Sequence, residues 1–153
     1  MFPTLLILAA TIAVLLVFGT IIPNGFAPLQ DELLILQASA TLTTTQNGAA
    51  LDMGSGFSPG GGGFPVQCAI NATAVKVSAG NESYTFKMQD SPDNATWTDR
   101  TPPVVFAAPG ALPDMIALQG FITARYARLV VTIAGTAPTI TFDNVYLNPM
   151  TVA

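Results

Sequence analysis

The chain has 153 residues, of which half are hydrophobic and only 9% are charged, and its formal net charge is −4. Its five Lys and Arg residues are too few for a basic nucleic-acid-binding surface, so no nucleic-acid partner is expected. The chain lacks histidine, the commonest general base, and its single cysteine excludes an internal disulfide. Because ordinary soluble domains carry about 25% charged residues, we expect this surface to be covered by a membrane, an oligomer or a larger assembly.

The sequence begins with an apolar segment, and we expect residues 1–30 to be separate from a domain over residues 31–153. Phe2–Ile22 carries no charge, and about 20 apolar residues can span a bilayer as a helix. Three interpretations stay open: a retained membrane anchor, a cleaved signal peptide, and a helix or arm buried between subunits. A signal peptide is expected to carry a basic residue before its apolar core, and this run has none. The candidate interface side chains in this segment are Leu5, Leu6, Leu15 and Phe18.

Alternating apolar and polar residues follow this segment and predict β-strands. Leu33 and Ile35 are expected on the inner face of a first strand, which runs on into the sequence SATLTTT (39–45). The Asn47-Gly48 pair is a strong signal for a two-residue hairpin turn.

A glycine-rich loop, GSGFSPGGGG (54–63), comes next. A phosphate-binding loop requires a Gly-Lys-Ser/Thr sequence followed by a helix, and neither is present. The loop is instead interpreted as a candidate contact with a neighbouring molecule, through Phe57 within the loop and Phe64 directly after it.

A long alternating segment begins after this loop. Residues 64–70 place their apolar side chains on one face, and residues 73–77 continue the alternation with the opposite parity. The change near Asn71-Ala72 predicts a β-bulge or a corner. Cys68 shares the apolar face of the first part and is interpreted as a small core residue.

The single tryptophan follows a dense turn sequence. Tyr84–Gln89 predicts a strand, Asp90–Asn94 a turn, and Ala95–Thr98 a returning strand. Trp97 is expected to face inward and close one end of a sandwich. The alternative is that Trp97 forms a stacking platform for a sugar or a base.

The remaining sequence continues the strand pattern. Residues 104–106 predict a short strand, 109–113 a loop, and 127–133 the clearest late strand, while Phe142 and Tyr146 are expected to face inward on the last one. The pattern gives about eight strands, which predicts an all-β antiparallel β-sandwich or jelly roll preceded by an apolar N-terminal helix or arm. The residues assigned to its core and scaffold are Trp97, Tyr84, Phe86, Cys68, Tyr126, Leu129 and Phe142.

Residue chemistry favours a structural role over catalysis. No Ser/His/Asp, Cys/His or paired-Glu arrangement is evident, so neither an enzyme nor a cofactor is expected. Asp90, Asp93 and Asp99 lie near one turn and, with Asn94, could offer oxygen ligands to calcium. Because capping of the turn explains the carboxylates equally well, no metal is assigned.

Two segments together resemble discoidin-type jelly rolls: YTFKMQDSPDNATWTD (84–99) and ITARYARLVVTIAGTAPTITFDNVYLNP (122–149). The shared order is a polar strand, a Ser/Asp turn, a tryptophan and then a strand with an aromatic residue and arginines. The resemblance implies scaffold roles for most matching positions and ligand binding by loops at one end. This chain lacks the cysteine pair of that family. The matching positions are Ser91, Asp93, Trp97, Arg125, Tyr126 and Arg128.

The closer resemblance is to small capsid decoration or cement proteins of tailed phages, which have a β-sandwich fold. DELLILQASATLTTTQNGAALDMG (31–54) is similar to their opening, and RYARLVVTIAGTAPTITFDNVYLNP (125–149) to their ending. The resemblance implies a virion protein on the capsid surface, partnered by the major capsid protein and by copies of itself as a dimer or trimer. Two alternatives stay open: a membrane-anchored or secreted carbohydrate-binding module of the discoidin type, and a membrane-associated protein of a membrane-containing phage that contacts the bilayer through residues 2–22.

Overall fold

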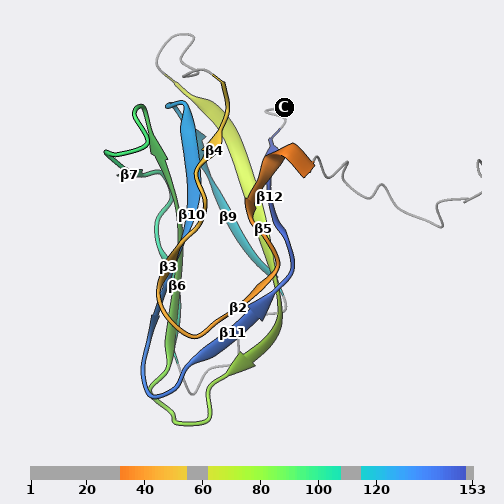
Figure 1. Cartoon of the computed structure of the whole chain (residues 1–153), viewed down its shortest axis with the longest axis vertical. Helices are drawn as coiled ribbons and strands as arrows, with labels where there is room; N and C mark the ends of the chain where they lie inside the picture. Colours follow the sequence, from red (N-terminus) through yellow and green to blue (C-terminus); the bar gives the residue numbers. More distant parts are fainter. Residues whose placement is uncertain (1–31, 55–61, 108–114, 151–153) are drawn as a thin grey trace, which may run out of the picture.

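The computed structural model describes residues 32–54, 62–107 and 115–150, which form an all-β sandwich of two antiparallel sheets (Figure 1). The predicted fold class is thereby confirmed, while the expected N-terminal helix or arm lies outside the described residues. In chain order, the described elements are the 3-10 turn η1 (Glu32–Leu34) and the strands β1 (Ile35–Gln37), β2 (Ala40–Leu42), β3 (Gln46–Asn47), β4 (Leu51–Asp52), β5 (Phe64–Lys76), β6 (Ser83–Ser91), β7 (Thr98–Asp99), β8 (Val104–Ala107), β9 (Met115–Ile122), β10 (Tyr126–Ala134), β11 (Thr139–Phe142) and β12 (Val145–Pro149).

Several short strands lie end to end and share one position in a sheet. β12 and β11 pair in succession along β5, while β1 and β2 pair with β12 and β11 in turn. In the second sheet, β3 and β4 both pair with β10, and β7 and β8 both pair with β6. The described strands therefore occupy eight positions, in the orders β1/β2–β12/β11–β5–β9 and β3/β4–β10–β6–β7/β8.

The chain crosses between the sheets at every step but one. Only the step from β6 to β7/β8 joins neighbours in the same sheet. Strands that are adjacent in sequence therefore mostly face each other across the core, and strands far apart in sequence pair edge to edge. This path over eight positions is that of a jelly roll, one of the two folds that the sequence predicted.

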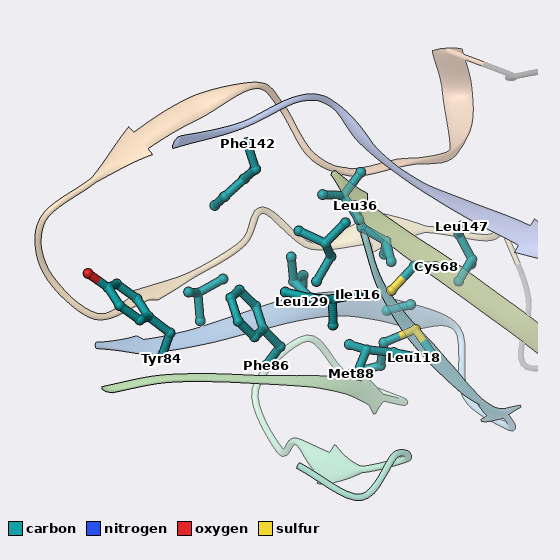
Figure 2. Close-up of a cluster of buried hydrophobic side chains, with 14 of the residues drawn as sticks. Leu36, Cys68, Tyr84, Phe86, Met88, Ile116, Leu118, Leu129, Phe142 and Leu147 are labelled. Atoms are coloured by element: carbon teal, nitrogen blue, oxygen red, sulfur yellow. The ribbon is translucent and has the colours of Figure 1, made fainter. Parts of the chain in front are cut away.

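The core consists of alternating inward side chains from both sheets, which converge in Figure 2. Five of the residues assigned to the core, Tyr84, Phe86, Cys68, Leu129 and Phe142, are fully buried. The Tyr84 hydroxyl lies 3.0 Å from the Thr139 carbonyl oxygen and accepts a hydrogen bond from the Thr139 N–H. A phenol that is buried with hydrogen-bond partners ties β6 to β11 across the two sheets at little desolvation cost.

The first strand has the opposite phase to the one predicted. Leu33 is 80% exposed in η1, and Leu36 is the buried residue of β1 instead of Ile35. The 3-10 turn delays the start of the strand, and the register shifts between Ile35 and Gln37. Because side chains alternate with period two, a one-residue offset exchanges the inner and outer faces.

The prediction of a hairpin turn at Asn47-Gly48 is also wrong. Asn47 pairs with Val130 in β10, and the Gly48 N–H donates to the Leu129 carbonyl oxygen over 2.7 Å. A Cβ atom at position 48 would lie 2.8 Å from the Leu36 carbonyl oxygen. Glycine is therefore needed here because two strands approach closely, and not because the chain turns.

The long alternating segment folds as a single strand, β5, with the predicted irregularity. Thr141 pairs with Ala74 but Phe142 pairs with Ala72, so the register shifts where the parity of the sequence changes. This confirms the predicted β-bulge. The inward orientation predicted for Tyr146 is wrong, because Val145 on one side of it is buried and the ring itself faces outward.

The sequence pattern does not reveal the strand β9, because MIALQGFI is largely apolar on both faces and contains Gly120. Ile116, Leu118 and Ile122 point into the core, while Met115 and Phe121 point outward. With Gln119 as the one polar residue of its outer face, the strand carries only a weak period-two signal. The loop predicted at 109–113 lies outside the described residues.

Candidate functional site

Trp97 lies on the outer face of the β10 sheet, and its predicted place in the core is wrong. The guanidinium carbon of Arg128 lies 3.9 Å from the centroid of the indole ring. Arg128 faces outward because Ala127 and Leu129, its neighbours on β10, are buried. The returning strand is shorter than predicted, since only Thr98–Asp99 pairs with β6. One face of Trp97 is thus occupied by Arg128, which leaves that face unavailable for stacking on a sugar or a base.

A chain of polar contacts holds Arg128 over the ring. Its Nε and Nη2 atoms donate to Gln89 Oε1 over 2.9 and 2.7 Å, and partial burial lowers the Arg128 pKa. Gln89 Nε2 in turn donates to Asp99 Oδ1 over 2.6 Å, and Asp99 forms an ion pair with Lys87. The hydrogen bond from Gln89 and that from Lys87 lower the Asp99 pKa. Arg128, Gln89, Asp99 and Lys87 thus form one connected polar network on this surface.

The carboxylates considered for calcium serve three separate networks. Asp90 is buried, forms an ion pair with Arg100 at 2.7 Å, and accepts hydrogen bonds from the Thr123 and Ala124 N–H groups. Asp93 accepts from the N–H groups of Thr96 and Ala95 and thereby caps its own turn, and these bonds hold its pKa well below the usual range. In the part of the chain that the structure describes, no three potential metal ligands come together.

Asp52 and Arg125 form a bidentate pair between β4 and the start of β10. Arg125 Nε and Nη2 donate to the two Asp52 carboxylate oxygens over 2.7 and 2.6 Å. The hydrogen bond from Arg125 lowers the Asp52 pKa to about 2. The Arg125 guanidinium carbon also lies 5.1 Å from the centroid of the Tyr126 ring. Tyr126, the first residue of β10, is only half-buried on the outer face, so its assignment to the core is wrong. Its ring instead contacts the Arg125 guanidinium.

The predicted interface residues fall mainly outside the described part. Phe64 is half-buried at the start of β5. The other proposed interface side chains, Leu5, Leu6, Leu15, Phe18 and Phe57, lie outside the described residues. Among the residues that are described, no helix is long and apolar enough to cross a membrane.

Three of the four large exposed apolar side chains in the described residues lie on β8 and β9, Val105 on the outer face of one sheet and Met115 and Phe121 on the outer face of the other. Val105 is 57% exposed on β8, and Met115 and Phe121 are 63% and 54% exposed on β9. β9 lies close to the residue that follows β7, since a Cβ atom at Gly120 would lie 2.5 Å from the Arg100 carbonyl oxygen. We call Val104–Ala107 and Met115–Ile122 together the β8–β9 edge.

The β8–β9 edge is a surface at which another molecule can bury apolar area. β8 ends one sheet and β9 ends the other among the described strands, because each pairs with a single neighbour. Edge strands with outward apolar side chains favour association with another molecule. The sequence signal was the pair of large apolar residues Met115 and Phe121 on the outer face of β9, which also weakens the alternation that would reveal the strand.

No protein-family model matches the sequence, and a search of curated proteins finds no significant relative.

Proposed function

We propose that this chain is a structural protein of a virus particle, which decorates or cements a phage capsid by bridging neighbouring capsid subunits. The observation that carries the proposal is a jelly roll whose β8–β9 edge presents Val105, Met115 and Phe121 to solvent. Jelly rolls are a recurring architecture of capsid domains. Because fold alone does not imply function, the exposed apolar edge is the feature that connects this fold to assembly.

The composition supports the same proposal. Only 9% of the residues are charged, which leaves few groups that would resist burial in a permanent contact. Each apolar side chain buried at an interface contributes about 25 cal/mol per Å² removed from water. The expected partners are the major capsid protein and further copies of this chain, arranged as a symmetric dimer or trimer.

The proposed mechanism is mechanical. A protein that binds neighbouring subunits only when they are assembled shifts the equilibrium toward the assembled shell by mass action. The β8–β9 edge would supply contact area, and the buried jelly-roll core would keep that edge rigid. No bond is made or broken in this role.

The first test is fractionation of a producing culture on a density gradient, with the intact mass of the protein measured in each fraction. The proposal expects the protein in dense, nucleic-acid-filled particles. Its presence only in cell membranes or in the medium would overturn the capsid role.

A second test addresses the surface. Phe121→Ser and Val105→Ser should reduce the amount of protein in the particle fraction, because both side chains are exposed and their loss leaves the core intact. Leu33→Ser is the matched control, since Leu33 is 80% exposed but precedes β1, at the opposite edge of the sheet from β9. Equal particle occupancy for all three variants would rule out the β8–β9 edge as the contact.

A further inference from the structure

A hollow of about 570 Å³ lies on the outer face of the sheet that contains β5, β9 and β12. Ala69 on β5 contributes a short side chain to its lining. Asn71 and Met115, which also pair across β5 and β9, form one wall, and Tyr146 on β12 lies in another. The volume is within the range of about 300–1,000 Å³ that small-molecule sites occupy.

Hydrogen bonds hold the polar wall in place. Asn71 Nδ2 donates to Asp143 Oδ2 over 2.6 Å, and the Asp143 N–H donates to the Asn71 carbonyl oxygen over 3.1 Å. Asn144 Oδ1 accepts from the Ser39 N–H over 2.6 Å, and its Nδ2 donates to the Tyr146 hydroxyl over 3.3 Å. These groups are therefore positioned before any ligand arrives, which lowers the entropic cost of binding.

The same groups keep hydrogen-bonding capacity for a ligand. Asn71 Oδ1 and Asp143 Oδ1 make no hydrogen bond to another described residue, and Asn148 adds a further amide to the lining. Amides offer donors and acceptors side by side, and a carboxylate offers acceptors. A ligand that carries adjacent hydroxyl groups, each both donor and acceptor, matches this set.

The rest of the lining disfavours anionic ligands and favours a ligand with an apolar face. Asp143 is the one charged side chain that lines the hollow in the described structure, so no cation is available to hold a phosphate or a sulfate. The half-buried Tyr146 ring and the 63% exposed Met115 side chain offer apolar surface beside the polar wall. A sugar ring combines C–H groups on one face with hydroxyl groups at its rim, and so fits both surfaces.

We propose that this hollow binds a neutral carbohydrate, with sugar hydroxyls on Asn71 and Asp143 and an apolar sugar face against Tyr146. The site lies on the outer face of the β5 sheet, whereas Trp97 lies on the outer face of the β10 sheet. It is therefore distinct from the loop-tip site that the sequence suggested. The inference does not rest on the proposed capsid role: Met115 belongs both to the lining and to the β8–β9 edge, but Asn71, Asp143 and Tyr146, which are assigned to hold the sugar, do not belong to that edge.

The test uses the full chain and a named set of probes. Glucose, galactose, mannose and N-acetylglucosamine are examined individually by saturation-transfer NMR, and an array of neutral glycans extends the panel. At least one neutral sugar should bind, and Tyr146→Ala, Asn71→Ala and Asn148→Ala should each weaken that binding by about tenfold or more, equivalent to the loss of about one favourable contact. Asn148 makes no side-chain hydrogen bond to another described residue, so its variant should keep the fold.

Matched controls are available on the other sheet. Tyr126→Ala removes a half-buried outward tyrosine from β10, and Asn47→Ala removes an exposed asparagine from β3. Both should bind the sugar as the wild type does. The proposal is overturned if no neutral sugar binds or if only sulfated or phosphorylated glycans bind. It is also overturned if the three variants in the hollow bind the sugar as tightly as the two controls.

Discussion

The guanidinium of Arg128 lies over the indole of Trp97, with 3.9 Å from its carbon to the ring centroid. The two residues are far apart in sequence and come together because β10 pairs with β6, while Trp97 precedes the short strand β7 on the other side of β6. A cation over an aromatic face is worth about 0.5–1 kcal/mol at a partly exposed site. The contact thus joins the segment that contains Trp97 to Arg128 on the outer face of β10.

Removal of Arg128 should uncover the indole. We expect Arg128→Ala to raise the acrylamide quenching of Trp97 fluorescence and to lower the free energy of unfolding by about 1 kcal/mol. Trp97 is the single tryptophan, so the signal has one source. Arg125→Ala is the control, because Arg125 lies over Tyr126 instead. Unchanged quenching in Arg128→Ala would contradict the stacked arrangement.

The strands were predictable where only one of their faces is apolar. On β10, Leu129 and Val131 point inward while Thr132 points to solvent, so the period-two pattern is visible in the sequence. On β9, Met115, Ala117 and Phe121 point outward beside the polar Gln119, so the alternation with inward Ile116 and Leu118 is weak. The signal therefore fails at β9, where the outward apolar side chains depart from the pattern of a solvated strand.

Other features depended on contacts between distant residues. Gly48 resembles a turn glycine in sequence, but its role follows from the closeness of the Leu36 and Leu129 carbonyl oxygens. The hollow requires Asn71 on β5 and Asp143 after β11 to meet, which only the pairing of these strands reveals. Local propensity contains neither relationship, because both arise from register between strands.

Gly48 gives a direct test of the close approach. Gly48→Ala would place a Cβ atom 2.8 Å from one carbonyl oxygen and 3.0 Å from another, and both belong to strand backbone that cannot move freely. We expect a loss of about 2 kcal/mol in urea unfolding. Gly62→Ala should cost less than about 0.5 kcal/mol, because no atom of the described residues lies within 4 Å of its Cβ position. Equal midpoints for the two variants would contradict the predicted crowding.

Asp90 should matter more for stability than any surface carboxylate. Asp90→Ala leaves Arg100 without its partner and two N–H groups, those of Thr123 and Ala124, without their acceptor. We expect a loss of about 3 kcal/mol, since removal of one partner of a buried ion pair is strongly destabilising. Asp99→Ala, which breaks the exposed pair with Lys87, should cost less than about 1 kcal/mol. Urea unfolding of both variants measures the two losses of stability. Similar losses would contradict the larger contribution expected of Asp90.

The Asp52–Arg125 pair predicts a loss of stability in acid. The folded pKa of Asp52 is about 2, below its usual value of 3.8, so the folded state binds fewer protons than the unfolded state. The stabilisation from this pair is complete above about pH 5 and is lost as the pH falls through about 2. Asp52→Asn should therefore show a shallower fall of the urea midpoint over this range than the wild type. Arg125→Ala should behave like Asp52→Asn. If the urea midpoint of both variants falls as steeply with pH as that of the wild type, the Asp52–Arg125 pair is not the cause of the acid destabilisation.

Cys68 should be inert in the folded protein. Burial raises the pKa of its thiol to about 12, and the side chain is fully shielded from solvent between the sheets. At pH 8 only about one molecule in ten thousand would carry the thiolate that attacks a disulfide reagent. We expect negligible reaction with 5,5′-dithiobis(2-nitrobenzoic acid) in native buffer and one equivalent of colour in guanidinium chloride, because the chain has a single cysteine. Gly48→Ala should react faster than Gly62→Ala, since a weaker sandwich exposes its core more often. Rapid labelling of the native protein would place Cys68 outside the core and contradict the register of β5 against β9 and β12.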